Sequence, residues 1–248
     1  MGGLIIHTLR IYGNSFEVRR ASVECGKIAR MQPANRRVKI EENPRIQIGD
    51  TAPEFIVALV RMHPELGSVS FNIYSPLPGV NERLGDAHSK PAAEIVNNFL
   101  FEDTHNEHWE VFANDLTTEI INERIKNLPR DQALGLKSKC IFRDGTVRYI
   151  PMMDFKLGHS TGNLELLRTF LQRLALKGVI VDSGTSYHFY GFDFLDHARW
   201  MKFMGECLLV PWSDSRWIGH CLLADGGGLR VSATELKPKL PVICEVLR

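Results

Sequence analysis

Two pairs of polar residues stand two positions apart at the ends of apolar, strand-like runs. The first pair is Asp154 and Lys156, and the second is Ser186 and His188. Residues i and i+2 of a strand share a face, so each pair would present both side chains to one side of a sheet. A carboxylate is a preferred Mg²⁺ ligand, a lysine can neutralise a phosphate, and serine and histidine can hydrogen-bond phosphate oxygens. The two pairs therefore point to phosphate chemistry.

Three further charged residues follow downstream and could serve the same site. Asp214 could supply another carboxylate, and Arg216 and Arg230 could contact phosphate, because a guanidinium group binds phosphate bidentately. Each assignment has a structural alternative. The arginines could equally be surface ion-pair partners, and His188, which stands between two aromatic residues, could be an ordinary strand histidine.

Two other clusters of polar residues could form binding sites. Residues 102–110 (EDTHNEHWE) contain His105 and His108, a His-x-x-His spacing that can bind zinc on a helix, but no further ligand spacing completes a recognised site. We interpret this segment as a polar loop. Between Arg19 and Arg45 there are eight basic residues against three acids, which could form a phosphate-binding strip or simply a solvated basic surface.

Composition sets broad limits on the class of protein. The chain has 248 residues, of which 44% are hydrophobic and 24% charged, as expected for an ordinary globular protein. The formal net charge of +1 gives no global argument for nucleic-acid binding. Five scattered cysteines without a Cys-x-x-Cys pair indicate neither a disulfide framework nor a zinc ribbon. The absence of a long apolar run predicts no membrane span and a cytoplasmic location.

The elements that must position these residues are predicted from periodicity and turn residues. An Asp144-Gly145 turn predicts a hairpin, Asn43-Pro44 predicts short strands around a turn within 38–48, and the segment 78–91 is expected to be a loop. Apolar spacing predicts helices at 53–62, 115–128, 164–176 (with Asn163 as its cap) and 195–208. Strands are expected at 68–74, 137–142, 147–155, 179–183, 186–192, 217–223 and 229–232, the last two flanking a glycine-rich turn.

Three clusters in this order resemble the motifs of the archaeo-eukaryotic primase superfamily. The run YIPMMDFK at 149–156 is similar to that family's hydrophobic strand ending in Asp-x-Asp or Asp-x-Glu. The run SGTSYHFY at 183–190 resembles its Ser-x-His strand, and WSDSRWI at 212–218 with LRVS at 229–232 resembles its third, hydrophobic-Asp motif and the strand that follows it. The resemblance covers about 147–232 and implies an α/β (α+β) fold, with an N-terminal module at 1–136 and an RRM-like module at 137–248 that carries the site.

The resemblance also implies roles for the site residues. Asp154 and Asp214 would be the catalytic, metal-binding carboxylates for Mg²⁺ or Mn²⁺. The residues expected to contact nucleoside triphosphate are Lys156, Ser186, His188, Arg216 and Arg230.

The sequence departs from the family where the second acid of the first motif is expected. An ammonium group at Lys156 repels a cation and cannot ligate it, so two-metal catalysis would need another acid, for which Asp182 is a candidate. Alternatively, Lys156 neutralises a phosphate directly, and binding outlives catalysis.

The leading hypothesis is a primase-polymerase-like nucleotidyltransferase core that binds nucleoside triphosphate and DNA or RNA, with catalysis impaired by the lysine. The second is a catalytically inactive primase-like module that senses nucleotides or nucleic-acid ends, within a larger replication, repair or defence complex. A plain RRM-like RNA binder is a third alternative, but the aromatic strand pattern of that class is missing.

Overall fold

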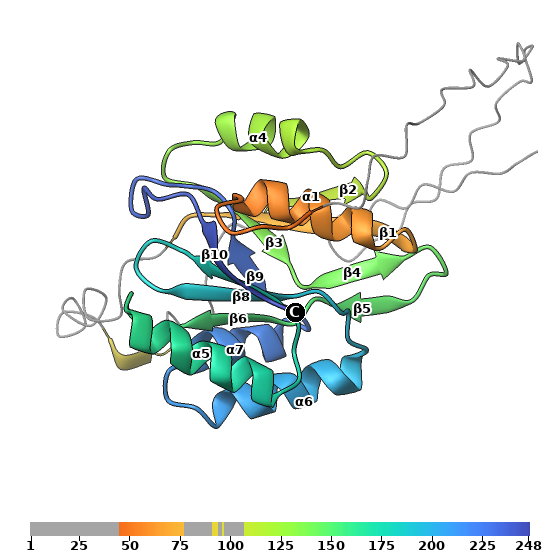
Figure 1. Ribbon diagram of the computed structural model, residues 1–248. Coiled ribbons are helices and arrows are strands. Elements are labelled where there is room, and N and C mark those ends of the chain that lie inside the picture. Colours follow the sequence, from red (N-terminus) through yellow and green to blue (C-terminus); the bar gives the residue numbers. More distant parts are fainter. Residues whose placement is uncertain (1–44, 77–90, 94–95, 97–106) are drawn as a thin grey trace, which may run out of the picture. The chain divides into compact units, whose positions relative to one another are not determined.

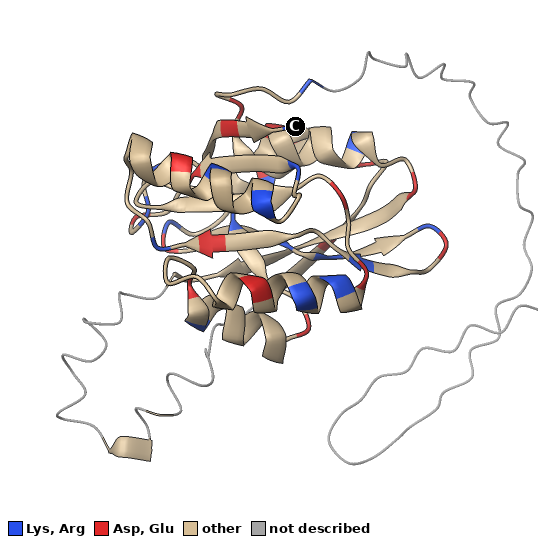
Figure 2. Ribbon diagram, turned by 60° about the horizontal axis from the view of Figure 1, so that its bottom comes forward, with Lys and Arg blue, Asp and Glu red and all other residues tan. Residues whose placement is uncertain are grey.

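The computed structural model describes residues 45–76, 91–93, 96 and 107–248, which belong to one compact unit spanning 41–248 (Figure 1). The expected turn at Asn43-Pro44, the loop at 78–91 except for Pro91, His105 and most of the basic run from Arg19 lie outside the described residues. In the described part of the chain, no helix is long and apolar enough to cross a membrane. Ribbon colouring by charge shows acidic and basic residues interspersed over the elements (Figure 2), in line with the net charge of +1.

The described part of the chain consists of helices and antiparallel strands. The helices are α1 (Ala52–Met62), α4 (Thr118–Lys126), α5 (Thr161–Arg173), α6 (His197–Leu208) and α7 (Ser215–Leu223). The strands are β1 (Leu66–Tyr74), β2 (Glu107–Phe112), β3 (Ala133–Lys137), β4 (Lys139–Phe142), β5 (Val147–Tyr149), β6 (Met152–Phe155), β7 (Gly178–Asp182), β8 (Tyr187–Gly191), β9 (Gly228–Arg230) and β10 (Val242–Leu247). The strands form one six-stranded and one four-stranded sheet.

The six-stranded sheet is built around β1. Phe71 of β1 is matched with Trp109 of β2 on one edge and with Leu136 of β3 on the other. Strands β3 and β4 are separated only by Ser138 and pair with different halves of β1, after which β9 joins β3 and β5 joins β4. Because the pairing is interrupted at Ser138, the continuous stretch β3–β4 pairs with both halves of β1.

The four-stranded sheet has the order β10-β7-β8-β6 and is antiparallel throughout. Its strands are apolar on both faces because each face is covered. On β8, Tyr190 belongs to the core shared with the six-stranded sheet, whereas Tyr187 and Phe189 belong to the core beneath the helices. By strand alternation, His188 therefore lies on the same face as Tyr190, toward the six-stranded sheet.

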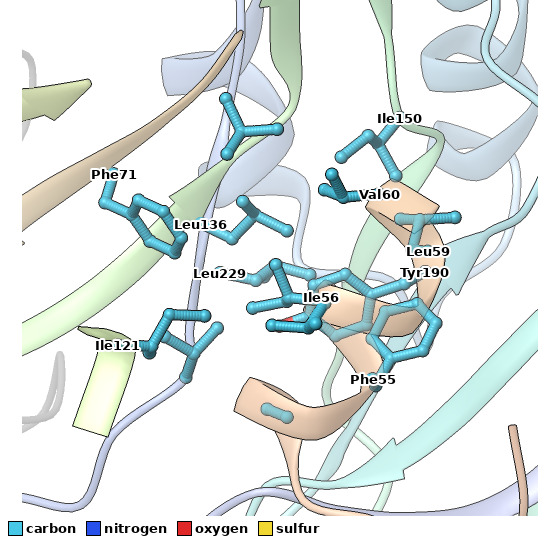
Figure 3. Close-up of a cluster of buried hydrophobic side chains, with 14 of the residues drawn as sticks. Phe55, Ile56, Leu59, Val60, Phe71, Ile121, Leu136, Ile150, Tyr190 and Leu229 are labelled. Carbon is cyan, nitrogen blue, oxygen red and sulfur yellow. The ribbon is translucent and has the colours of Figure 1, made fainter. Parts of the chain in front are cut away.

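The first core joins the two sheets through helix α1 (Figure 3). The backbone N–H of Thr51 donates to the Glu54 carboxylate at 2.7 Å, and Pro53 occupies the first turn, two features that favour a helix start. The ring of Phe55 on this helix lies 5.5 Å from that of Tyr190. Side chains of α1 thus link residues of both sheets into one apolar cluster.

The second core lies between the four-stranded sheet and helices α5, α6 and α7, which cover its other face (Figure 1). Each helix starts at a side chain that accepts a backbone hydrogen bond: Ser160 from Asn163 at 3.1 Å, and Asp196 from Arg199 at 2.8 Å. Trp200 of α6 is fully buried in this core. Because α7 begins at Asp214, the packing of this layer also fixes a candidate site residue.

The mixed α+β class is confirmed, as are the hairpin at Asp144-Gly145 and the four predicted helices. The RRM-like module is not confirmed: β8 lies between β6 and β7, but β10 adds at the edge of β7. The division into modules at 1–136 and 137–248 stays a prediction.

Three element predictions were wrong. Residues 217–223 form most of α7 instead of a strand, because Asp214 caps a short apolar run whose periodicity suits either structure. The polar segment before Glu110 contributes to β2, where pairing with β1 overrides composition. The expected strand 147–155 is broken at Ile150-Pro151, so β5 and β6 enter different sheets.

Candidate functional site

Backbone hydrogen bonds along the free edge of β6 bring two of the predicted motifs together. On one side of β6, Asp154 is matched with His188 of β8. On the other side, the N–H of Asp214 donates to the Asp154 carbonyl at 2.9 Å, and the N–H of Lys156 donates to the Trp212 carbonyl at 2.7 Å. The segment 212–214 thus runs along β6 like a short strand, which places Asp214 beside Asp154.

The carboxylate of Asp214 already has several partners. Its Oδ1 atom accepts from the backbone N–H groups of Arg216 and Trp217, each at 3.0 Å, and so caps α7. The Nζ atom of Lys156 lies 3.1 Å from the same oxygen. The lysine that replaces the expected acid therefore forms an ion pair with the acid of the third motif.

These donors do not fit a two-ion metal centre. Asp154 and Asp214 line the same cavity, but the Lys156 ammonium group pairs with Oδ1 of Asp214 and repels a cation there, which leaves one carboxylate where two ions would need shared ligands. Among the residues that the structure describes, no group of three His, Cys, Asp or Glu side chains could hold a metal ion. Asp182, the candidate substitute, lines neither of the two cavities described here and contacts His159 at 3.0 Å, Lys239 and the Gly184 N–H.

A cavity of about 150 Å³ gathers most of the predicted phosphate contacts. Ser186, His188 and Arg230 line it together with Asp154. His188 is 6% exposed, and its Nε2 atom lies 3.7 Å from Oδ1 of Asp154. Within the described residues, its Nδ1 atom has no hydrogen-bond partner. Burial, reinforced by the charges of Arg230 and Lys237, lowers the pKa of His188 to about 3, so the imidazole is neutral at neutral pH.

The environment of Asp154 has the opposite effect on its protonation. Burial and the neighbouring charge of Asp214 raise the pKa of Asp154 to about 7, although Lys237, Lys156 and Arg230 oppose the shift. This carboxyl group is therefore only partly ionised at neutral pH. A half-ionised acid is a weaker cation ligand and repels an anionic ligand less than a full carboxylate does.

Arg230 is a buried cation held by backbone oxygens. Its guanidinium group donates to the carbonyls of Ser183, Ser232 and Lys239, the last at 3.1 Å. Burial lowers the pKa of Arg230 from its ordinary value. The arginine thus ties the Ser183 turn to the chain segment after β9, and its charge remains close to the smaller cavity.

Lys237 is a site residue that the sequence prediction missed. It lines the smaller cavity, and its Nζ atom donates to Oγ1 of Thr185 at 3.3 Å. Its backbone N–H donates to Oγ1 of Thr234 at 3.0 Å, which fixes the local turn. The only sequence signal was a Lys-Pro-Lys run downstream of the third motif, and nothing in its spacing indicated the site.

A second cavity of about 560 Å³ adjoins the first. The two share five lining residues, namely Tyr74, Pro76, Asp154, Trp217 and Gly228. The predicted residue Arg216 lines the larger cavity, as does Lys137 of β3, which the sequence prediction also missed. The structure thus brings six of the seven predicted residues to the two cavities, whereas Lys156 adjoins them through its pair with Asp214.

The glycine-rich turn after α7 forms one wall of the larger cavity. A Cβ atom on Gly227 would lie 2.4 Å from Sγ of Cys221, so only glycine fits there. The turn begins at Asp225, whose φ of 51° is uncommon for a non-glycine residue. Lys139 at 2.5 Å and the Tyr149 hydroxyl at 2.7 Å hold the Asp225 carboxylate and so fix the start of the wall.

Comparison with known proteins identifies a family for the chain. A family model described as AEP-like, archaeo-eukaryotic primase 1D-like, matches residues 112–241, which is just over half of the 248 residues. The matched region includes every predicted site residue. No curated protein and no solved structure matched the chain.

Proposed function

The chain belongs to the archaeo-eukaryotic primase-like family, and from this premise we propose that it binds a nucleoside triphosphate beside a nucleic-acid strand, with nucleotidyl transfer impaired. Membership supports a primase-like nucleotidyltransferase core at a coarse level. The observation that carries the finer proposal is the set of side chains around the smaller cavity, where Arg230, Lys237 and His188 converge.

The smaller cavity has the chemistry that a triphosphate needs. Lys237 offers an ammonium group, Ser186 offers a hydroxyl group from the turn before β8, and His188 offers an imidazole from β8 itself. The hydrogen bonds of Arg230 go to backbone carbonyl groups, so this residue would attract a phosphate through its charge. Arg216 lies across the boundary in the larger cavity, where it would meet phosphate or sugar.

Catalysis is the part of the family's activity that this site supports least. The expected Mg²⁺ or Mn²⁺ ligation by Asp154 and Asp214 stays a prediction for at most one ion, because Lys156 neutralises one of the two acids. We therefore expect nucleotide binding to persist in EDTA and primer extension to be weak or absent. Loss of ATP binding on adding EDTA would contradict this part of the proposal.

The direct test is to measure ATP binding by calorimetry and primer extension with Mg²⁺ or Mn²⁺ on the same preparation. His188→Ala should weaken ATP binding, whereas His63→Ala is the matched control, since His63 follows α1, contacts Glu65 and Phe192, and lines neither cavity. If the two variants and the wild type bind ATP with equal affinity, the nucleotide does not bind in the smaller cavity.

A second candidate function is a catalytically inactive module that senses nucleotides or nucleic-acid ends. The ion pair between Lys156 and Asp214 at 3.1 Å favours it, because this pair stabilises the site without a metal. Robust primer extension by the wild type would exclude this candidate. Binding of DNA or RNA, a place in a replication, repair or defence complex and a cytoplasmic location remain predictions.

A further inference from the structure

A partly buried lysine lines the larger cavity and has no ion-pair partner in the part of the chain that the structure describes. Lys137 ends β3 and is matched across the ladder with Gly228 of β9, which has no side chain to cover it. Within residues 45–76 and 107–248, Lys137 forms no ion pair and no side-chain hydrogen bond. Its neighbour Lys139, by contrast, pairs with Asp225 at 2.5 Å.

This arrangement is costly for the protein alone. Taking an ammonium group partly out of water without a counter-charge is unfavourable, and burial and the charge of Lys139 both lower the pKa of Lys137. An anion in the larger cavity would offset both effects. The lysine is thus placed as half of an ion pair whose other half comes from a ligand.

The nucleotide's own triphosphate is not the best candidate for that anion. The smaller cavity has its own phosphate-binding groups in Arg230 and Lys237, and Lys137 does not line it. The larger cavity, at about 560 Å³, has room for a further nucleotide-sized group.

The larger cavity also offers an aromatic surface beside the cation. Trp217 lines it, with the indole N–H fixed on the Gly228 carbonyl at 3.1 Å, and Tyr74 lies at the boundary with the smaller cavity. Proteins that bind single strands combine cations along the backbone with aromatic rings on which bases stack.

We propose that the larger cavity binds one nucleotide unit of a single-stranded nucleic acid, with Lys137 on its backbone phosphate. This inference rests on the proposed function, because it places the strand next to the triphosphate at the shared boundary of the two cavities. A backbone contact carries no base preference, so the effect of Lys137 should be the same for strands of different sequence.

The test compares Lys137→Met with wild type in two titrations, one with a fluorescent single-stranded oligonucleotide over a range of salt and one with ATP. Oligonucleotide affinity should fall about tenfold, as for the loss of one bond to a charged group, and the log–log salt slope should fall by about 0.7. ATP affinity should be unchanged. Lys137→Arg should retain most of the affinity, and Lys202→Met, on α6 and 76% exposed, is the charge-matched control.

The outcomes separate the inference from the function on which it rests. If Lys137→Met weakens ATP binding and leaves the oligonucleotide unaffected, the lysine serves the free nucleotide and the inference is overturned. Unchanged binding of both ligands overturns it as well, while leaving nucleotide binding intact. A wild-type protein that binds neither ligand overturns both proposals. Melting temperatures of all variants show whether each is folded, and Lys137→Gln replaces Lys137→Met if that variant is unfolded.

Discussion

Removing the acid at the centre of the site should stabilise the protein at neutral pH. Burial and Asp214 raise the pKa of Asp154 from its ordinary 3.8 to about 7. A group whose pKa is raised by folding favours the folded state fully below its unfolded pKa, and that contribution is lost as pH rises through the folded pKa. Ionisation of Asp154 above pH 7 therefore lowers the stability of the folded state. In Asp154→Asn the side chain is permanently neutral and this cost is absent.

The size of the effect follows from the pKa interval. From 3.8 to about 7, at about 1.4 kcal/mol per pH unit, the cost amounts to about 4 kcal/mol, an upper limit because the Asp154 side chain is 30% exposed and cations lie nearby. At pH 8 the free energy of unfolding of the variant should exceed that of the wild type by up to this amount. At pH 4 the two proteins should be nearly equally stable. His188 is present in both proteins, so its own titration largely cancels in the difference.

Urea denaturation of both proteins at pH 8 and pH 4 measures the two differences. Asp144→Asn is a control of opposite sign, because hydrogen bonds from Thr146 to the exposed Asp144 carboxylate lower the pKa of Asp144. That variant should be the less stable protein at pH 8, with the deficit shrinking as the pH falls through the pKa of Asp144. If Asp154→Asn gains no stability at pH 8, or gains equally at both values, the reasoning about its environment is wrong.

Three further expectations concern the same site. His188→Ala should weaken ATP binding roughly tenfold by calorimetry, as for a hydrogen bond to a charged group, and should also lower the melting temperature because the imidazole is buried; a lower melting temperature with unchanged affinity would leave the histidine a purely structural role. Lys156→Asp should increase Mg²⁺ affinity by restoring a carboxylate beside Asp154, and weaker or equal binding in a folded variant would argue against a vestigial metal site. Gly227→Ala should lower the melting temperature, since a methyl group would clash with Cys221, whereas Gly219→Ala, with open space around it, should not.

The sequence predicted the local parts of the site better than their assembly. The strands that carry Asp154 and His188 were predicted from local patterns, but their i, i+2 partners Lys156 and Ser186 lie just outside β6 and β8, so the shared strand face did not extend to them. The edge pairing of 212–214 with β6 joins residues about 60 positions apart, and no local periodicity encodes such pairing.

The same limit explains why Lys137 and Lys237 were missed. Neither residue belongs to a motif: Lys137 reaches the larger cavity because Gly228 lies opposite it, and Lys237 reaches the smaller one because Arg230 anchors the segment that carries it. Each position depends on a contact made by another part of the chain. Single-sequence patterns record the type of these residues and not the cavity that they line.

The replacement of the second acid by Lys156 changes the charge balance of the site in a definite direction. Around the shared boundary of the cavities, Lys156, Arg230 and Lys237 provide three cations against two carboxylates, one of which, Asp154, is only partly ionised near pH 7. With an acid at position 156, the same five positions would carry two cations and three acids and would need metal ions before a triphosphate could approach. The lysine therefore supplies from the protein part of the positive charge that a metal would bring, which agrees with the proposal that a triphosphate binds here while nucleotidyl transfer is impaired.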